Sequence, residues 1–366
     1  MVNLEAVFRS GVGAKCAALA KLPGVSGNCT TTHHPTNSST TMTKFKNWKG
    51  ILYGIAYGIV SRAIFALEDF RGENPVFPTF GLMTLSFMFI VPFVVGLIVA
   101  YHNDTVTSSR KIVMMTPVFA VVGLIVFAVL SGKEGTICAL MALPVFIIMA
   151  FIGGFIGVRI FKRNRNKLYV SAFALLPFVI APIENKIGIK DKIFTEHTTI
   201  EINSNSGKVW DNITRVKNID EKENNYSLFQ FMGFPRPIEA ELDTIAVGGI
   251  RKAIFARGLF FTETVTKVEP YKILAFDIKA DPNSIPPKTL DEHVTVGGKY
   301  FDVLEGKYEI EQLSNNKIKL HLTSQFRLST PFNFYSGLWS KIIMKDIQKN
   351  ILKIIKERSE KKSSRR

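Results

Sequence analysis

The sequence has few of the residues on which metal sites and covalent catalysis usually depend. Its 366 residues include six histidines and three cysteines, Cys16, Cys29 and Cys138. Cysteines so widely spaced form neither a disulfide framework nor a zinc motif, and no histidine stands at metal-ligand spacing. No Ser/His/Asp set, phosphate-binding glycine loop or paired-carboxylate motif stands out. We therefore predict no metal and no cofactor, and we assign no catalytic residue.

Acidic residues are also scarce, with 30 Asp and Glu against 46 Lys and Arg, a formal net charge of +16. Such an excess is typical of nucleic-acid binding, of an anionic membrane surface, or of topology signals beside membrane spans. No nucleic-acid recognition motif accompanies the charge. A basic cluster from Lys162 to Lys167 directly follows a long apolar run. The third interpretation is therefore favoured, and we predict no nucleic-acid partner.

The first part of the chain lacks any long apolar run. Residues 1–43 include the stretch Thr30–Thr41, rich in Thr, Ser and His, which cannot bury enough apolar surface to fold. We predict that this segment is disordered, or that it is an extension absent from the mature protein because translation begins at Met42. An organelle-targeting peptide is a further possibility, since Arg9 and Lys15 occur with few acidic residues.

Long apolar segments follow and predict a transmembrane helical domain over residues 44–186. A helix needs about 20 residues to cross a bilayer. Four segments reach at least the lower limit of about 17 residues, and a fifth is shorter, contains two prolines, and is either a tilted span or a re-entrant or interfacial segment. We thus predict four or five spans, with glycines such as Gly153 and Gly157 allowing close helix packing. The segments are Ile51–Leu67, Phe80–Tyr101, Ile112–Ser131, Thr136–Phe161 and Leu168–Ile183.

The basic residues in the short loops predict the orientation of these spans, because positive loops stay in the cytoplasm. Lys44, Lys46 and Lys49, the pair Arg110-Lys111 and the Lys162–Lys167 cluster fall on one side if the spans alternate. The chain is therefore predicted to be an integral membrane protein with a cytoplasmic N-terminus. Five spans would place its C-terminal domain outside the cytoplasm, and four would place it inside.

The C-terminal half alternates polar and apolar residues, as half-buried strands do. Strands are predicted at 194–203, 238–246, 253–267, 272–280, 307–313 and 317–328, with Thr198, Ile200 and Ile202 on one face of the first. A short helix is predicted at 208–214. A long helix from Ser336 to about Glu360 carries an apolar stripe at Trp339, Ile343, Ile347, Ile351 and Ile354. These elements predict an α+β domain over 187–360, in which a curved antiparallel sheet grips the last helix, followed by a basic tail at 361–366.

The order of these elements and three sequence stretches resemble the START-like, or polyketide cyclase (SRPBCC), superfamily. The stretches are IEINSNSGKVWDNI at 200–213, GGKYFDVLEGKY at 297–308 and TPFNFYSGLW at 330–339. The last two are similar to bacterial membrane proteins that join such a helix-grip domain to several spans. The resemblance implies a deep apolar cavity between sheet and helix, suited to a lipid or another hydrophobic molecule. It implies no particular reaction.

Glu263 is the most informative candidate in that cavity, because it shares a strand face with Leu259, Phe261 and Val265. A carboxylate among apolar side chains is costly unless it is paired. It is therefore a polar handle or general base in the cavity, or it is paired with Arg251 or Arg257, or a bulge at Gly258 alters the face. The predicted cavity residues are Glu263, Arg257, Phe261, Tyr300, Tyr308, Phe326, Trp339 and Ile343.

Three functions are compatible with these observations. The first is membrane-tethered binding or transfer of a lipid-like ligand, whose partners are a membrane lipid or other hydrophobic small molecule and the bilayer itself. The second is a cyclase- or hydrolase-type enzyme using Glu263, Tyr300 or His293 as acid or base. The third is a structural or sensory protein whose cavity is filled by side chains and whose partner is another membrane protein. The lack of a catalytic constellation favours the first.

Overall fold

The structure is a computed structural model. It describes residues 48–66, 82–103, 110–132, 135–163, 167–224, 228–231, 233–280 and 295–361. The predictions for the N-terminal extension, for most of the basic tail and for His293 fall outside these residues.

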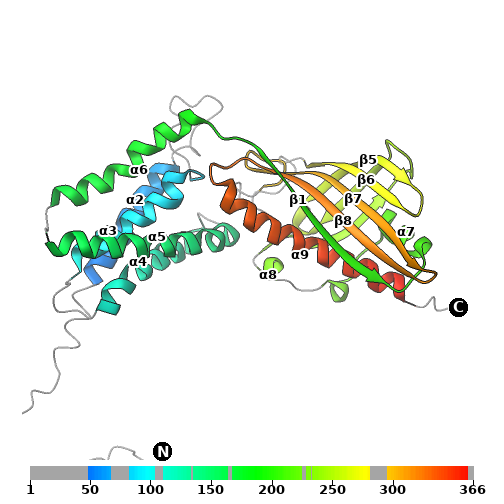
Figure 1. Ribbon diagram of the computed structural model, residues 1–366, viewed down its shortest axis with the longest axis horizontal. Coiled ribbons are helices and arrows are strands. Elements are labelled where there is room, and N and C mark those ends of the chain that lie inside the picture. Colours follow the sequence, from blue (N-terminus) through cyan, green and yellow to red (C-terminus); the bar gives the residue numbers. More distant parts are fainter. Residues whose placement is uncertain are drawn as a thin grey trace, which may run out of the picture. The chain divides into compact units, whose positions relative to one another are not determined.

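Apolar helices make up the first half of the described chain (Figure 1). A π-helical turn leads directly into α3, and Glu184 of α6 accepts hydrogen bonds from the backbone N–H groups of Leu85 and Ser86 at its start. That carboxylate satisfies donors that every helix start leaves unpaired. The elements are α2 (Trp48–Phe65), η2 (Ser86–Ile90), α3 (Val91–His102), α4 (Arg110–Leu130), α5 (Thr136–Arg163) and α6 (Lys167–Ile187).

Glycines allow α3 and α5 to pack closely, as predicted. A side chain at Gly153 would overlap the backbone of Phe93, and one at Gly157 would come within 2.7 Å of Ala100. A side chain at Gly96 would in turn overlap the backbone of Ala150. Small residues at such positions let the two helix backbones approach each other.

The prediction of four or five spans is wrong for the described residues. Two helical segments, Val113–Leu130 and Thr136–Phe161, are long and apolar enough to cross a membrane. Ser86–His102 and Leu168–Glu184 are shorter apolar helices, since the first begins only after a turn at 82–84 and the second lies between Lys167 and Glu184. Lys49, Arg62 and two tyrosines dilute the apolar character of α2. The count of apolar stretches took no account of the turn before α3 or of the polar residues within α2.

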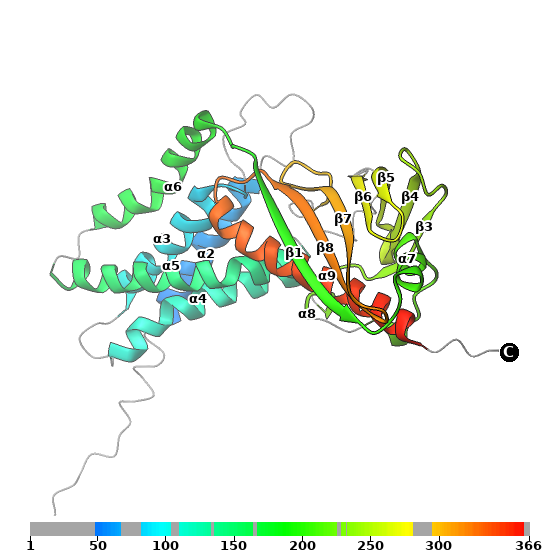
Figure 2. The same ribbon diagram turned by 45° about the vertical axis from the view of Figure 1, so that its right-hand side comes forward.

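The second half contains an antiparallel sheet in the order β1-β8-β7-β6-β5-β4-β3-β2. Each strand pairs antiparallel with its neighbour. Figures 1 and 2 show that this sheet is curved. The strands are β1 (Lys192–Ile202), β2 (Arg215–Val216), β3 (Pro237–Leu242), β4 (Ile250–Phe255), β5 (Phe260–Glu269), β6 (Ile273–Ala280), β7 (Phe301–Ser314) and β8 (Lys317–Leu328).

The predicted strand 253–267 is in fact two strands, β4 and β5, joined by a tight turn. Arg257 and Gly258 in this turn have φ angles of 63° and 81°, values that reverse the chain and that glycine adopts readily. In β8 the side chains from Ile318 to Leu328 alternate between buried and half-buried, as predicted. The Gly248-Gly249 and Gly297-Gly298 pairs lie in turns.

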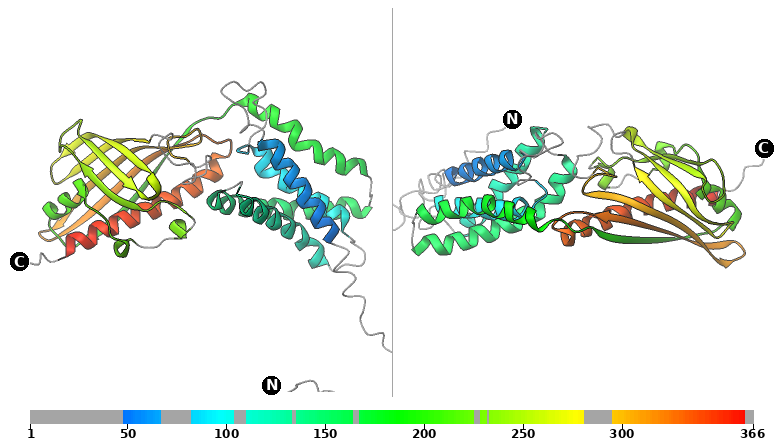
Figure 3. Two further views of the ribbon diagram at one scale, coloured as in Figure 1. Left: turned by 180° about the vertical axis from the view of Figure 1, so that it is seen from behind. Right: turned by 90° about the horizontal axis from the view of Figure 1, so that it is seen from above.

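Helix α9 (Asn333–Glu360) lies along the concave side of the sheet (Figure 3). Its Ile343, Ile354 and Ile355 are buried, and Leu352 and Ile355 join a core with Val209, Trp210 and Ile213 of α7 (Ser206–Thr214). The predicted curved sheet with a long C-terminal helix is confirmed. The stripe at three- and four-residue spacing predicted it together with the alternating strands, because a helix with one apolar face must pack against another element and the strands supply a sheet.

Both ends of α9 are fixed to the rest of the domain. Near its start, a side chain at Gly337 would lie 2.6 Å from the Phe194 ring, so glycine lets the helix pack against β1. Near its end, Arg358 donates two hydrogen bonds to the Glu223 carboxylate and others to the carbonyls of Lys217 and Asn218. These contacts hold the start of the helix against β1 and its end against residues 217–223.

Candidate functional site: a cavity between the sheet and the last helix

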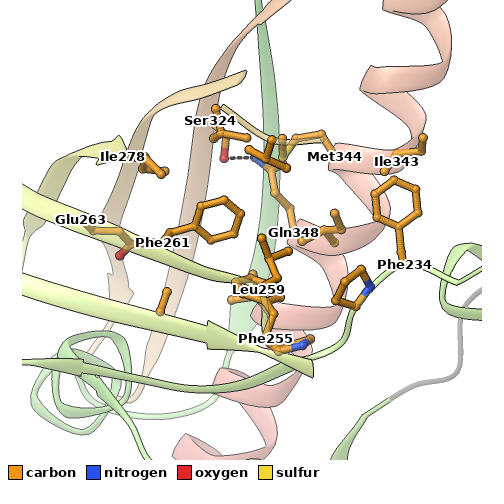
Figure 4. Close-up of a pocket in the computed structure, with 18 of the residues that line it drawn as sticks. Phe234, Phe255, Leu259, Phe261, Glu263, Ile278, Ser324, Ile343, Met344 and Gln348 are labelled. Carbon is orange, nitrogen blue, oxygen red and sulfur yellow. Dashed lines mark hydrogen bonds between the residues drawn. The ribbon is translucent and has the colours of Figure 1, made fainter. Parts of the chain in front are cut away.

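A cavity lies between the concave face of the sheet and α9. It offers about 190 Å³ to the centre of a water molecule, which is more than a single water site requires. Its walls come from β2 to β8, from the segments before β3 and β7, from α9, and from Met83 and Met141 of the helical half (Figure 4). Apolar side chains dominate the walls, among them Phe234, Phe255, Leu259, Phe261, Ile278 and Met344.

The cavity arises from the alternation of the strands and from one glycine. Leu322, Ser324 and Leu328, an even number of residues apart, project from the same face of β8 onto the cavity side. Gly306 of β7 is paired with Phe276 of β6, and a side chain at Gly306 would overlap the Phe276 ring. Glycine at this position therefore leaves room for the ring, and both residues line the cavity.

One ion pair lines this apolar cavity. Arg251 of β4 and Glu263 of β5 are cross-strand neighbours, and the Arg251 Nη1 donates to the Glu263 Oε2. The two residues are 4% and 6% exposed, so the charges are almost fully removed from water. Tyr308 of β7 lies beside the same guanidinium, whose Cζ is 5.4 Å from the centre of the Phe276 ring.

The burial of this group changes its acid–base properties. Loss of water raises the pKa of the Glu263 carboxyl, and the neighbouring Arg251 lowers it only in part. Burial likewise raises the pKa of the Tyr308 hydroxyl. The Arg251 Nε is buried without a hydrogen-bond partner among the described residues. The group is thus an incompletely satisfied polar element in an otherwise apolar wall.

A second polar element ties α9 to the sheet beside the cavity. Gln348 accepts a hydrogen bond from Thr198 of β1 at 2.7 Å, and it donates to Ser324 of β8 at 2.9 Å and to the Glu196 carbonyl at 3.2 Å. Figure 4 shows the Gln348–Ser324 bond. Because both groups of the amide are used, Gln348 fixes the position of the helix across two strands.

The structure brings five of the eight predicted residues together at the cavity: Glu263, Phe261, Tyr300, Tyr308 and Ile343. The other three lie elsewhere. Arg257 is exposed in the β4–β5 turn and donates to the Gly233 carbonyl at 3.1 Å. Phe326 is fully buried and stacks on Phe194, while Trp339 packs against the same core.

Sequence reasoning considered Arg251 only as a partner for Glu263, and it did not single out Gln348 or Gly306. One signal could have found the Arg251–Glu263 pair. Both residues lie six positions from Arg257, so a hairpin that turns there places them opposite each other. Gln348 interrupts the apolar stripe of α9 where the helix must be buried, which is itself a sign of a polar partner.

No group of three or more His, Cys, Asp or Glu side chains among the described residues is placed to hold a metal ion. His197 and His321 meet on the other face of the sheet, with ring nitrogens 3.1 Å apart, and His321 also contacts Glu311 at 3.0 Å. This chain of polar groups is separate from the cavity residues.

No protein-family model matches the chain, and no curated protein matches it. Among solved structures, a truncated norcoclaurine synthase from Thalictrum flavum is similar, at 9% identity and a TM-score of 0.30, over 48% of this chain and 98% of that chain. An uncharacterized protein from Rhizobium leguminosarum has 10% identity and a TM-score of 0.29, over 46% and 98%. A conserved protein of unknown function from Enterococcus faecalis has 14% identity and a TM-score of 0.27, over 50% and 82%. Similarity this low supports no conclusion about ligand or activity.

Proposed function

We propose that this chain binds a hydrophobic, lipid-like molecule at a membrane and holds or transfers it without altering it. The observation that carries the proposal is the cavity, whose wall is apolar except for a few polar groups such as the Arg251–Glu263 pair, Ser324 and Gln348. Ligand sites commonly combine apolar walls with few polar groups that orient the ligand. The resemblance of residues 190–360 to START-like domains belongs to the same proposal.

The apolar wall would supply most of the affinity. Each buried methylene group contributes roughly 0.8 kcal/mol, so a chain of eight to ten methylenes gains roughly 6–8 kcal/mol before the cost of ordering the ligand. The Arg251–Glu263–Tyr308 group would then orient a polar end of the ligand. Such a molecule partitions into bilayers, which explains why the domain is joined to apolar helices.

The two helices of spanning length support the membrane part of the proposal. Val113–Leu130 and Thr136–Phe161 are strongly apolar, and the basic residues between 162 and 167 follow the second one. We propose that these basic residues and the Lys44–Lys49 flank remain on the cytoplasmic side.

The same cavity is compatible with an enzyme that acts on a hydrophobic substrate. Glu263 has a raised pKa, and Tyr300 and Tyr308 also line the cavity. The ion pair weakens this alternative, because Arg251 occupies one carboxylate oxygen that a general base would use. The open space in the cavity argues against a structural protein whose cavity is filled by side chains.

Native mass spectrometry of the full chain, purified in mild detergent, tests the proposal together with organic extraction of what copurifies. We expect one lipid-like molecule per chain. Ala253→Phe would fill the cavity from β4 and abolish retention, whereas Ala275→Phe, the same change at a half-buried position between two buried residues of β6, would leave it unchanged. Glu263→Gln should weaken retention.

Two outcomes would contradict the proposal. The chain could carry no hydrophobic molecule even when it is purified in the presence of lipid extract. Alternatively, both phenylalanine variants could retain the molecule equally, which would place the binding site elsewhere.

A further inference from the structure

The first turns of α9 have an exposed apolar stripe on the side away from the cavity. Phe334, Leu338 and Ile342 are spaced by four residues and are 70%, 58% and 44% exposed. Four-residue spacing puts them on one face of the helix. Exposed large apolar residues that form a continuous stripe mark a contact surface.

Along the same face of the helix, the exposed residues change from apolar to basic. After Ile342 the corresponding exposed positions are Lys345 and Lys349, with Lys341 beside the apolar residues. The apolar part extends over about 12 Å, given a rise of about 1.5 Å per residue. An apolar face bordered by lysines is the pattern of helices that lie in the interface of an anionic bilayer.

The connection between α6 and β1 is bound to the start of α9. Four residues, 188–191, connect the apolar helix α6 to β1. The Asn333 side chain donates to the Lys190 carbonyl at 2.9 Å, and the Ser329 hydroxyl donates to Asp191 at 2.7 Å. The start of α9 is therefore bound to the segment that leaves α6.

Further apolar exposure surrounds the same place. Ile187, Ile189 and Ile193, at the end of α6 and the start of β1, are 77%, 41% and 59% exposed. The Phe334 ring lies 5.9 Å from the ring of Phe89, in the π turn that leads into the apolar helix α3. Apolar side chains from three elements thus accumulate near one end of α9.

We infer that the stripe Phe334–Leu338–Ile342 lies in the interface of the bilayer, with Lys345 and Lys349 at its headgroups. The opposite side of the same turns, at Ser340, Ile343 and Met344, lines the cavity. These turns of α9 are then the wall between the bilayer and the cavity, and ligand is exchanged past them. The inference rests on the proposed function for the role of the cavity, but not for the position of the helix.

Spin labels on the full chain test this position. Cys16, Cys29 and Cys138 are replaced by serine, and single cysteines are introduced as Leu338→Cys, Ile342→Cys and, as the control on the same face, Lys349→Cys. Each variant is labelled and reconstituted in vesicles of phosphatidylcholine and phosphatidylglycerol. Collision with oxygen, which concentrates in the bilayer, is compared with collision with a water-soluble nickel chelate.

The ratio of oxygen to nickel accessibility should be several-fold higher at 338 and 342 than at 349. Equal ratios at all three positions would overturn the inference, because the stripe would then face water. Protection of 338 and 342 from both reagents would also overturn it, because a protein or a second copy of the chain would then cover the stripe.

Native mass spectrometry of the same labelled proteins separates this inference from the proposed function. Bound lipid with a water-exposed stripe contradicts the inference alone. A stripe in the bilayer without bound lipid contradicts the proposed function alone.

Discussion

The buried pair Arg251–Glu263 makes each of its charges dependent on the other. Removing one member of a buried pair leaves an uncompensated charge, at a cost of about 3–5 kcal/mol, whereas an apolar replacement of both is often neutral. We therefore expect Arg251→Met to lower the free energy of unfolding by about that amount. The double variant Arg251→Met/Glu263→Met should recover most of the loss.

Denaturant titration of the detergent-solubilised chain measures both variants. If the double variant were as unstable as the single one, the pair would stabilise the sheet by itself and the charge argument would be wrong.

Glu223 provides a stability effect that depends on pH. The hydrogen bonds from Arg358 hold the pKa of the Glu223 carboxyl below its usual range. A carboxyl whose pKa is depressed in the folded state stabilises the fold above its unfolded pKa, about 4.3, and that stabilisation is lost as the pH falls through the folded value. Glu223→Gln should therefore be less stable than the natural chain at pH 7 and nearly equal to it well below pH 4.

The comparison needs unfolding curves of both proteins between pH 3 and pH 7. Glu269 supplies a control, because its carboxylate is exposed and pairs with Lys267 on the surface. Glu269→Gln should have little effect at any pH, since exposed pairs contribute little. A difference between Glu223→Gln and the natural chain that persisted at low pH would contradict the assignment.

At the scale of single elements, strand β7 determines how much space the cavity has. Gly306→Ala should push the Phe276 ring away from β7, because the added methyl group would overlap it. Both residues line the cavity, so we expect the fraction of chain that retains ligand in native mass spectrometry to fall. Gly207→Ala, in the first turn of α7, is the control, because the added methyl group would meet nothing nearer than the Asn205 Oδ1 at 3.6 Å. Unchanged retention in Gly306→Ala would show that the ring moves elsewhere.

The elements themselves could be predicted to different degrees. The burial of β8 and the stripe of α9 follow from periodicity, since a strand and a helix each bury one face. The turn at Ala256–Gly258 could not be found in this way, because Arg257 adopts a positive φ angle and arginine is not a residue that predicts one. The span count failed for another reason, because the apolar composition before α3 begins ahead of the helix, and residues 82–84 form a turn.

The candidate site was predictable only in part. Glu263 stood out because a carboxylate among apolar residues needs an explanation. Three predicted residues do not line the cavity: Arg257, Phe326 and Trp339. The direction of a side chain in a curved sheet or in a turn depends on tertiary packing, which the local sequence pattern does not contain. The sequence carried a signal for Arg251 and for Gln348, but only the structure shows their hydrogen-bond partners on other strands.

At the scale of the whole molecule, the apolar helices determine how the protein behaves during fractionation. Val113–Leu130 and Thr136–Phe161 are each long and apolar enough to cross a bilayer, and helices that cross a bilayer resist alkaline extraction. We expect the full chain to remain in the membrane pellet after an alkaline carbonate wash and to dissolve only in detergent. Release into the carbonate supernatant would show that these helices are the core of a water-soluble fold.

The four residues between α6 and β1 have a consequence for transport. A connection of that length spans at most roughly 14 Å, so the cavity domain always stays within one molecular diameter of the helix to which it is joined. On the proposed function, such a domain cannot carry its ligand through water from one membrane to another. It would serve only the lipid around it, and any recipient of the ligand would have to come to that lipid.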